Sequence, residues 1–217
     1  MLSGHQTRPA GKQTKGERTR QRILDVAEEL FANRGYEGTS LRQIARAAGI
    51  QEPGLYNHFA GKQVIYQAVL DRALYPLVEV LASHIDDAAQ LRDFTDLPSV
   101  MTDLLTDHPT AAPLLQQAVQ GDEDSVGTRL VMAWLDRLFN EGTRALQHLV
   151  APESAGPVEQ DRRALAINLI AMLNLVTGYF LSQRAFGTMA DGNLRDPDNI
   201  ARQKQLLHKV IRAMLVN

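Results

Sequence analysis

The residues whose types and spacing best fit a binding function lie between Thr39 and Lys62, where two short apolar patterns flank a glycine. The first pattern places apolar residues at steps of three and four, as one face of a helix requires: Leu41, Ile44, Ala45 and Ala48. Gly49 then predicts a turn, because a residue without Cβ adopts the left-handed conformation at little cost. We therefore expect a short helix that ends at a glycine turn.

A second short helix is expected after this turn, from about Gln51. Pro53 falls in its first turn, where backbone N–H groups have no intrahelical acceptor, and Leu55 and Phe59 form its buried face. Two helices joined in this way over residues 40–59 predict a helix-turn-helix, which reads DNA in the major groove. The alternative is a three-helix unit whose polar side chains only contact solvent.

The order and spacing of these segments resemble the TetR family of transcriptional regulators. The matching segments cover about the first third of the chain: residues 18–40, 41–50 and 55–59, followed by Lys62. Family members usually have Ser or Thr where this chain has Gln51, a poorer N-cap that costs roughly 1 kcal/mol of local stability. Gln51 therefore either starts the helix less firmly or contacts a base. Glu52 suits a positive helix N-terminus and can accept a hydrogen bond from a cytosine amino group.

The resemblance also implies which side chains meet DNA. Arg42 is expected to reach a guanine, and the start of the second helix is expected to lie against base edges: Glu52, Pro53 and Gly54. Donors that project from helix ends are expected to hold phosphates: Thr39, Ser40, Tyr56, His58 and Lys62.

Charge supports a polyanionic partner for the N-terminal part. Residues 1–62 hold ten Lys or Arg against six Asp or Glu, a net +4, whereas the remaining thirteen Lys or Arg against nineteen Asp or Glu give −6. These values sum to the formal net charge of −2. A basic front and an acidic rear orient one end of the chain toward DNA, although terminal tails are often basic without such a role.

Composition predicts an all-α protein in one chain of 217 residues. We expect three parts: a flexible basic arm (1–15), a three-helix helix-turn-helix domain (16–61), and a helical bundle for ligand binding and dimerisation (62–217). The arm lacks the apolar core of a signal peptide. The chain has no cysteine, which excludes disulfides and thiolate metal sites and fits a reducing cytoplasm.

Breakers divide the bundle into expected helices. Pro76 should end or kink a helix that begins after Gly61, further helices are expected over residues 96–108, 114–120 and 126–150, and residues 151–159 should form a loop. Residues 164–183 carry no formal charge and are long enough to span a bilayer, but their Asn, Thr, Ser and Gln favour a helix buried on every side. With the final helix, residues 200–215, this helix is expected to form a four-helix homodimer interface.

A ligand site is expected in the middle of the bundle. The candidates are apolar or amphipathic residues on helices that a bundle brings together: Met101, Leu105, His108, Trp134, Leu138, Phe139, Met172, Leu175 and Tyr179. His108, Tyr179 and Asn174 are the expected polar anchors. The alternative for each residue is ordinary core packing.

Catalysis finds little support in the sequence, because no His pair has metal-ligand spacing and no phosphate loop or nucleophile elbow occurs. We expect no cofactor and no enzyme activity. The resemblance implies a cytoplasmic homodimeric regulator that binds a pseudo-palindromic operator, typically a repressor released by a small apolar effector. The competing hypotheses are a helical-bundle enzyme and a partner-binding protein without DNA recognition.

Overall fold

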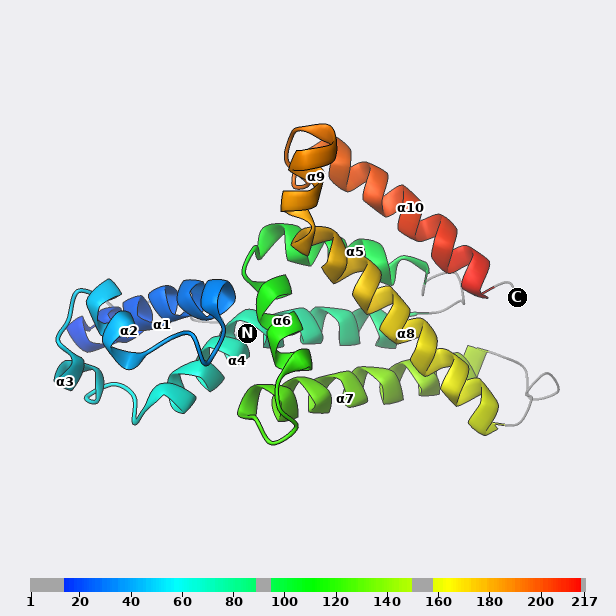
Figure 1. Cartoon of the computed structure of the whole chain (residues 1–217). Coiled ribbons are helices and arrows are strands. Elements are labelled where there is room, and N and C mark those ends of the chain that lie inside the picture. Colours follow the sequence, from blue (N-terminus) through cyan, green and yellow to red (C-terminus); the bar gives the residue numbers. More distant parts are fainter. Residues whose placement is uncertain (1–13, 89–94, 150–157, 216–217) are drawn as a thin grey trace, which may run out of the picture.

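A computed structural model describes residues 14–88, 95–149 and 158–215 of the chain, and the side chains of 146–149, 158–161 and 214–215 lie outside that description. These residues form ten helices and no strand, which confirms the predicted all-α class (Figure 1). The helices are α1 (Lys15–Arg34), α2 (Leu41–Ala47), α3 (Glu52–Leu55), α4 (Lys62–Asp86), α5 (Leu97–Asp107), α6 (Ala111–Gln120), α7 (Val126–Leu149), α8 (Val158–Leu181), α9 (Gln183–Ala190) and α10 (Pro197–Leu215). Most of the arm, residues 1–13, and most of the expected loop at 151–159 lie outside the described residues.

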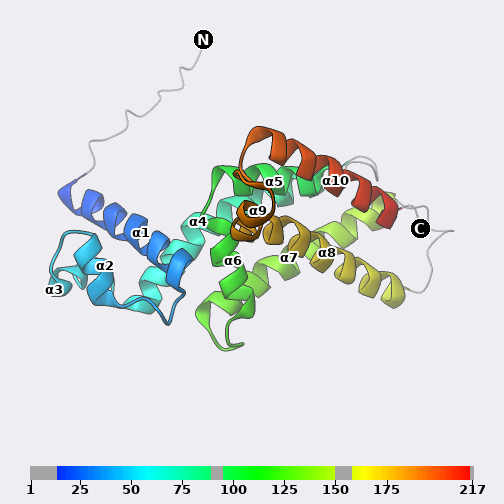
Figure 2. The same ribbon diagram turned by 45° about the horizontal axis from the view of Figure 1, so that its top comes forward.

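The helices form an elongated molecule with two ends joined by α4. Helices α1, α2 and α3, which we call the reader, lie at one end, and α5 to α10, which we call the body, lie at the other (Figures 1 and 2). Helix α4 packs on α1 of the reader and on α5, α6 and α7 of the body. One cluster of buried apolar residues extends from Ile23 in the reader to Leu207 in the body.

Helix α1 is defined at both ends by local signals. The Thr14 hydroxyl accepts from the Glu17 N–H, and the Glu17 carboxylate accepts from the Thr14 N–H at 2.6 Å, which completes a capping box. Gly35 ends the helix with φ of 74°, a conformation that favours glycine. The apolar stripe between these ends, including Ile23, Ala27 and Phe31, is fully buried.

Pro76 was expected to end or kink its helix, and the expected end is wrong, because α4 is one helix of 25 residues that includes Pro76. Proline removes one N–H donor and strains the preceding turn. Leu74 and Leu77, on either side of Pro76, are only 2% and 8% exposed, and their burial holds both halves of the helix in place. Tertiary packing here outweighs a local breaker.

Two further boundaries differ from expectation. Helix α6 begins at Ala111 rather than at 114, so Pro113 lies in its first turn, where proline is tolerated. The short α9 was not expected, and it follows α8 directly after Ser182.

Helices α8 and α10 differ in how far their apolar residues are buried. Helix α10 was expected to form part of a dimer interface, but its apolar stripe is buried within the chain, with Ile200, Leu207 and Ile211 at most 8% exposed. These residues face the protein interior because α10 packs on α5 and α8.

Helix α8 is the reverse case, because the expectation of burial on every side is wrong for the single chain. Its segment Arg162–Leu181 has a mean hydropathy of 1.8 and is long and apolar enough to cross a membrane, yet only 11% of it is buried. Ile167 and Ile170 are 65% and 59% exposed. A large apolar surface of α8 is therefore left uncovered in this chain.

Candidate DNA-binding surface and ligand cavity

The helix-turn-helix is built from a capped helix and a glycine turn. The Ser40 hydroxyl accepts from the Gln43 N–H, and the Gln43 side chain accepts from the Ser40 N–H at 2.8 Å, so α2 begins with a capping box. Gly49 has φ of 66°, and the N–H of Ile50 donates to the Ala45 carbonyl. This pattern, with the Gly49 N–H on Arg46, is a Schellman motif that fixes the direction of the chain as it leaves α2.

Helix α3 is a single helical turn supported by two buried apolar side chains. Leu55 is fully buried and Phe59 is 3% exposed, so both expected core positions are confirmed. Gln51 is the N-cap residue with extended backbone, but its side chain makes no capping hydrogen bond. Gln51 is exposed, and its amide group is therefore available to another partner.

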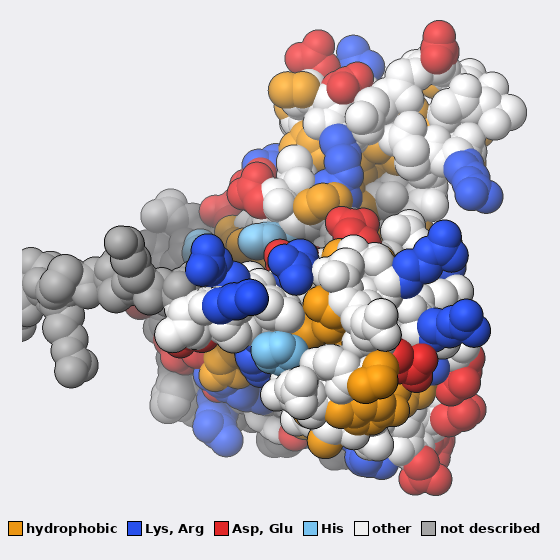
Figure 3. All heavy atoms as spheres, turned by 90° about the vertical axis from the view of Figure 1, so that its left-hand side faces the viewer, with side chains coloured by type: hydrophobic (Ala, Val, Ile, Leu, Met, Phe, Trp, Pro, Cys, Tyr) orange, Lys and Arg blue, Asp and Glu red, His pale blue; other side chains and the backbone are white. Residues whose placement is uncertain are grey.

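Nine of the ten predicted DNA-contact residues are exposed or half-buried, and Thr39 is the single exception. Ser40, Arg42, Gln51, Pro53 and Tyr56 are exposed. The others are half-buried at the same helix ends: Glu52, Gly54, His58 and Lys62. Figure 3 views this end of the molecule, where Lys and Arg side chains lie on both sides of a patch of apolar side chains and Asp and Glu gather along one edge.

Thr39 is the exception. Its side chain is 1% exposed, and its hydroxyl donates inward to the carbonyl oxygens of Gly35 and Leu30 at 2.9 and 3.2 Å. The Thr39 side chain therefore ties the end of α1 to the start of α2 rather than facing solvent.

Two arginines of α1 support the helix-turn-helix and were not identified from the sequence. Arg22 Nε donates to the Ala48 carbonyl at 2.7 Å, next to the glycine turn. The Arg20 guanidinium lies 4.8 Å from the centre of the Phe59 ring. Their spacing of two places them on no common helical face, so periodicity alone gives no signal for their shared role.

Lys62 begins α4, as predicted. Its ammonium lies 4.1 Å from the centre of the Tyr36 ring, which follows the C-terminal glycine of α1. The first residue of α4 therefore contacts the end of α1 through an aromatic face.

Polar contacts join the reader to the body beside α4. Arg72 of α4 pairs with Asp25 and Glu28 of α1 at 2.6 and 2.5 Å. Burial acts to lower the pKa of Arg72, but the hydrogen bonds that its guanidinium donates to the Glu28 and Asp25 carboxylates raise that pKa overall. The other Glu28 oxygen accepts from the Thr110 hydroxyl at 2.5 Å, immediately before α6.

Helix α6 makes a second link to α1. The Gln117 side-chain amide donates to the Ala32 carbonyl at 3.0 Å, while its Oε1 is buried without a hydrogen-bond partner. Leu115, two residues earlier, lines a cavity in the body. Helix α6 therefore touches both this cavity and the reader.

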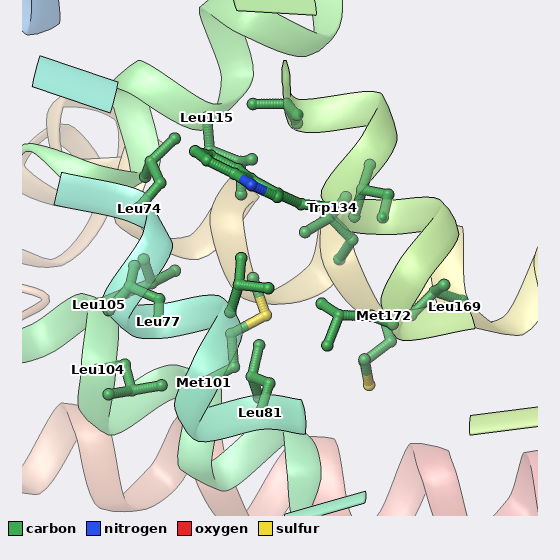
Figure 4. A pocket seen from close by; sticks show the side chains of 15 residues that line it. Leu74, Leu77, Leu81, Met101, Leu104, Leu105, Leu115, Trp134, Leu169 and Met172 are labelled. Atoms are coloured by element: carbon green, nitrogen blue, oxygen red, sulfur yellow. The ribbon is translucent and has the colours of Figure 1, made fainter. Parts of the chain in front are cut away.

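The cavity lies among α4, α5, α6, α7 and α8 and has a volume of about 70 Å³ (Figure 4). Its lining is entirely apolar among the described residues: Leu74, Leu77, Val78, Leu81, Met101, Leu104, Leu105, Leu115, Val131, Trp134, Leu135, Leu138, Leu169, Met172 and Leu173. The indole of Trp134 extends along one side, and Met101 and Met172 approach from other helices. Such a lining favours a hydrocarbon over a polar molecule.

The structure brings five of the nine predicted ligand residues to this cavity: Met101, Leu105, Trp134, Leu138 and Met172. The other four do not line it. His108 is exposed at the end of α5, and Leu175 is 42% exposed. Phe139 packs under the Arg162 guanidinium, and the Tyr179 hydroxyl donates to the Leu194 carbonyl at 2.6 Å.

The expected polar anchors therefore do not reach the cavity, since Asn174 is also exposed and donates to the carbonyl of Ile170. Four lining residues on α4 were missed: Leu74, Leu77, Val78 and Leu81. Their steps of three and four are the ordinary signal of a buried helical face. The expected break at Pro76, in the middle of this stripe, obscured that signal.

Comparison with known proteins agrees with this geometry. Residues 23–69 match the family model described as "Bacterial regulatory proteins, tetR family". The HTH-type transcriptional activator FasR of Mycolicibacterium smegmatis is 37% identical over 94 residues, which are 39% of this chain and 43% of FasR. The HTH-type transcriptional repressor KstR2 of Rhodococcus jostii is 39% identical over 90 residues, which are 39% of this chain and 44% of KstR2. The chain thus matches less than half the length of these relatives.

A solved structure extends the likeness of the fold to the body. The crystal structure of AibR in complex with isovaleryl coenzyme A and operator DNA superimposes with a TM-score of 0.66 at 18% identity and covers 88% of this chain and 97% of AibR. The matched segment at 23–69 contains the last part of α1, the whole helix-turn-helix and the start of α4. The N-terminal part of the chain is therefore similar to the DNA-binding domain of bacterial regulatory proteins of the tetR family.

Proposed function

We propose that the chain is a ligand-responsive transcriptional regulator that binds operator DNA as a homodimer in the cytoplasm and has no catalytic role. The observation that carries this proposal is the exposed surface of α2 and α3 over a rigid frame, with Gly49 in the left-handed conformation and Leu55 fully buried. A frame of this kind presents side chains to a major groove.

The proposed contacts follow the positions on this surface. Arg42 and the start of α3 face bases: Gln51, Glu52, Pro53 and Gly54. Ser40, Tyr56, His58 and Lys62 bind phosphates. Thr39 is left out of this set, because its hydroxyl is buried and hydrogen-bonded within the reader. We retain the division into an arm (1–15), a DNA-binding domain (16–61) and a ligand-binding and dimerisation domain (62–217).

The exposed surface of α8 supports a homodimer. Ile167, Ile170 and Leu175 leave a contiguous helix with large apolar side chains in solvent, which soluble proteins usually cover with a partner. A second copy of the chain is the partner that suits a two-half-site operator, since the symmetry of the dimer matches that of a pseudo-palindrome.

The proposed effector is a small hydrocarbon-bearing molecule bound in the cavity. A volume of about 70 Å³ is below the roughly 300 to 1,000 Å³ of typical ligand pockets. The site must therefore enlarge to admit an effector, and the flexible side chains of Met101 and Met172 make that possible at low cost. AibR, which has a similar fold, was crystallised in complex with isovaleryl coenzyme A. A short branched acyl chain of this kind suits an apolar cavity of this size.

Two elements would carry the response to the reader. Helix α4 lines the cavity with Leu74 and Leu77 and continues to Lys62. Helix α6 lines it with Leu115 and holds α1 through Gln117. An effector that favours one arrangement of these helices would change the separation of two readers that must fit grooves about 34 Å apart. Release from the operator by the effector is the mode we propose.

The test is selection of bound sequences from a random pool of duplex DNA by the purified protein. We expect enrichment of a pseudo-palindromic site. The control is a double variant, Arg42→Ala with Tyr56→Ala, whose exposed positions leave the fold intact by circular dichroism. Equal enrichment by the variant would remove these residues from the contact surface, and no enrichment by the wild-type protein would overturn the proposed function.

A further inference from the structure

Lys62 and Tyr36 form a cation–π contact. The Lys62 ammonium lies 4.1 Å from the ring centre, within the range in which an aromatic face attracts a cation. Lys62 is half-buried and begins α4, whereas Tyr36 lies in the segment between α1 and α2. A lysine has three N–H donors, so an ammonium over a ring retains donors that point to solvent.

The Tyr36 ring is itself held by other aromatic rings. Tyr66 lies 4.9 Å from Tyr36 and 4.9 Å from Phe31, measured between ring centres. Phe31 is fully buried and Tyr66 is 5% exposed, so the rings behind Tyr36 belong to the core. The position of the Tyr36 face is therefore fixed by the fold and not by solvent.

Tyr66 rests in turn on the body. A methyl group added at Gly127, the second residue of α7, would lie 2.7 Å from Cε1 of Tyr66 and 2.9 Å from its hydroxyl oxygen. Only a residue without Cβ allows the ring to lie this close. A continuous series of contacts therefore runs from α7 through Tyr66 and Tyr36 to Lys62.

Tyr36 remains a neutral phenol at ordinary pH. Burial raises its pKa, and the nearby charge of Glu37 raises it further. The aromatic face is thus available to the ammonium over the whole range in which the protein is handled.

We propose that Tyr36 is a positioning residue for Lys62: its ring holds the ammonium in place before DNA arrives, so that the lysine meets a phosphate without first losing its rotamer freedom. This inference rests on the proposed function and deepens it, because it identifies what orders one of the phosphate contacts. A free lysine side chain samples many rotamers, and binding a phosphate restricts them. The ring contact imposes that restriction in the free protein.

The test compares three variants on a random-sequence 30-bp duplex. Tyr36→Leu removes the aromatic face and should weaken binding about two- to fivefold, the effect of one exposed cation–π contact. Tyr36→Phe keeps the face and should bind like the wild-type protein. Lys62→Ala removes the phosphate contact and should also lower the slope of log K against log salt by about 0.9.

The salt slope separates positioning from contact. In Tyr36→Leu the lysine still reaches its phosphate, so affinity should fall while the slope stays at the wild-type value. In the double variant with Lys62→Ala, the Tyr36→Leu change should have no further effect on affinity. A further loss in that background would mean that Tyr36→Leu damages the reader in another way, and would overturn the inference.

A measurement without DNA completes the test. The ring current of Tyr36 should shift the NMR signals of the Lys62 Cε protons upfield in the wild-type protein and in Tyr36→Phe, but not in Tyr36→Leu. If the wild-type protein binds DNA and Tyr36→Leu binds equally well, the positioning role is wrong and the proposed function stands. If the wild-type protein binds no duplex even at low salt, the proposed function fails and the inference fails with it.

Discussion

The reader and the body bury their apolar residues in one continuous core, but the predicted DNA-binding surface and the cavity arise from different physical interactions. The surface of the reader depends on directional features: the capping box at Ser40, the left-handed Gly49 and the hydrogen bond from Arg22 to Ala48. The cavity of the body depends only on where apolar side chains from five helices meet. Directional contacts fix one geometry, whereas an apolar cavity can change shape while its contacts remain favourable. The reader therefore suits recognition and the body suits response.

The largest expected effect concerns the exposed apolar surface of α8, which is part of neither the predicted DNA-binding surface nor the cavity. Replacing Ile167 and Ile170 together by Glu places two charges on the exposed apolar face. The variant should sediment as a monomer and lose about 10² to 10⁴ in operator affinity, because two linked readers bind far more tightly than one. Met132→Glu on α7, at a side chain 40% exposed, is the control and should leave the dimer intact. An intact dimer in the α8 variant would move the interface elsewhere.

Two buried leucines test the contrast between the regions directly. Leu55 in the reader is fully buried and Leu105 in the body is 1% exposed, so each change to Ala should cost about 2 to 5 kcal/mol of unfolding free energy in urea. Below the unfolding midpoint, Leu55→Ala should also weaken operator binding, whereas Leu105→Ala should preserve it and enlarge the cavity. Equal loss of DNA affinity in both variants would show that the body is as rigidly coupled to recognition as the reader itself.

The opposite change at the same cavity position tests the response. Leu105→Trp fills the cavity with a large ring, and it should leave operator binding measurable while blocking its release by the effector. The measurement is a gel shift with increasing effector, beside the wild-type protein. Normal release from the filled variant would place the effector outside this cavity.

The sequence predicted the reader more accurately than the body, because the reader depends on local directional contacts and the cavity depends on packing between distant helices. Ser40, Gly49 and Pro53 act on their own backbone or on residues within one turn, so their effect can be read locally. The cavity depends on which faces of distant helices meet, and Pro76 suggested a break that the burial of Leu74 and Leu77 overrides. Thr39 shows the limit within the reader, because its type fits a phosphate contact and only the fold reveals that its hydroxyl turns inward.

A base contact has a smaller expected effect than assembly or core packing. Arg42 is exposed on α2, and Arg42→Ala should reduce discrimination at one operator position by about 1 to 3 kcal/mol, as for one bidentate pair with guanine. A binding-site selection with the variant measures this position by position. The control is Arg34→Ala, at an exposed arginine at the end of α1, which should leave every preference unchanged. Unaltered preferences in Arg42→Ala would assign base recognition to α3 alone.

The smallest effect separates two roles for Gln51, which begins α3 without a capping hydrogen bond from its side chain. A serine hydroxyl at this position can accept from the backbone N–H of the first turn, so Gln51→Ser should raise the unfolding free energy by about 0.5 to 1 kcal/mol. Gln67→Ser, at an exposed glutamine inside α4, has no free N–H to cap and should lower stability by about a few tenths of a kcal/mol. If Gln51 contacts a base through its free amide, the more stable Gln51→Ser variant will bind the selected operator more weakly than the wild-type protein. If stability and operator affinity rise together, Gln51 is only an imperfect cap, and the bases are read by its neighbours.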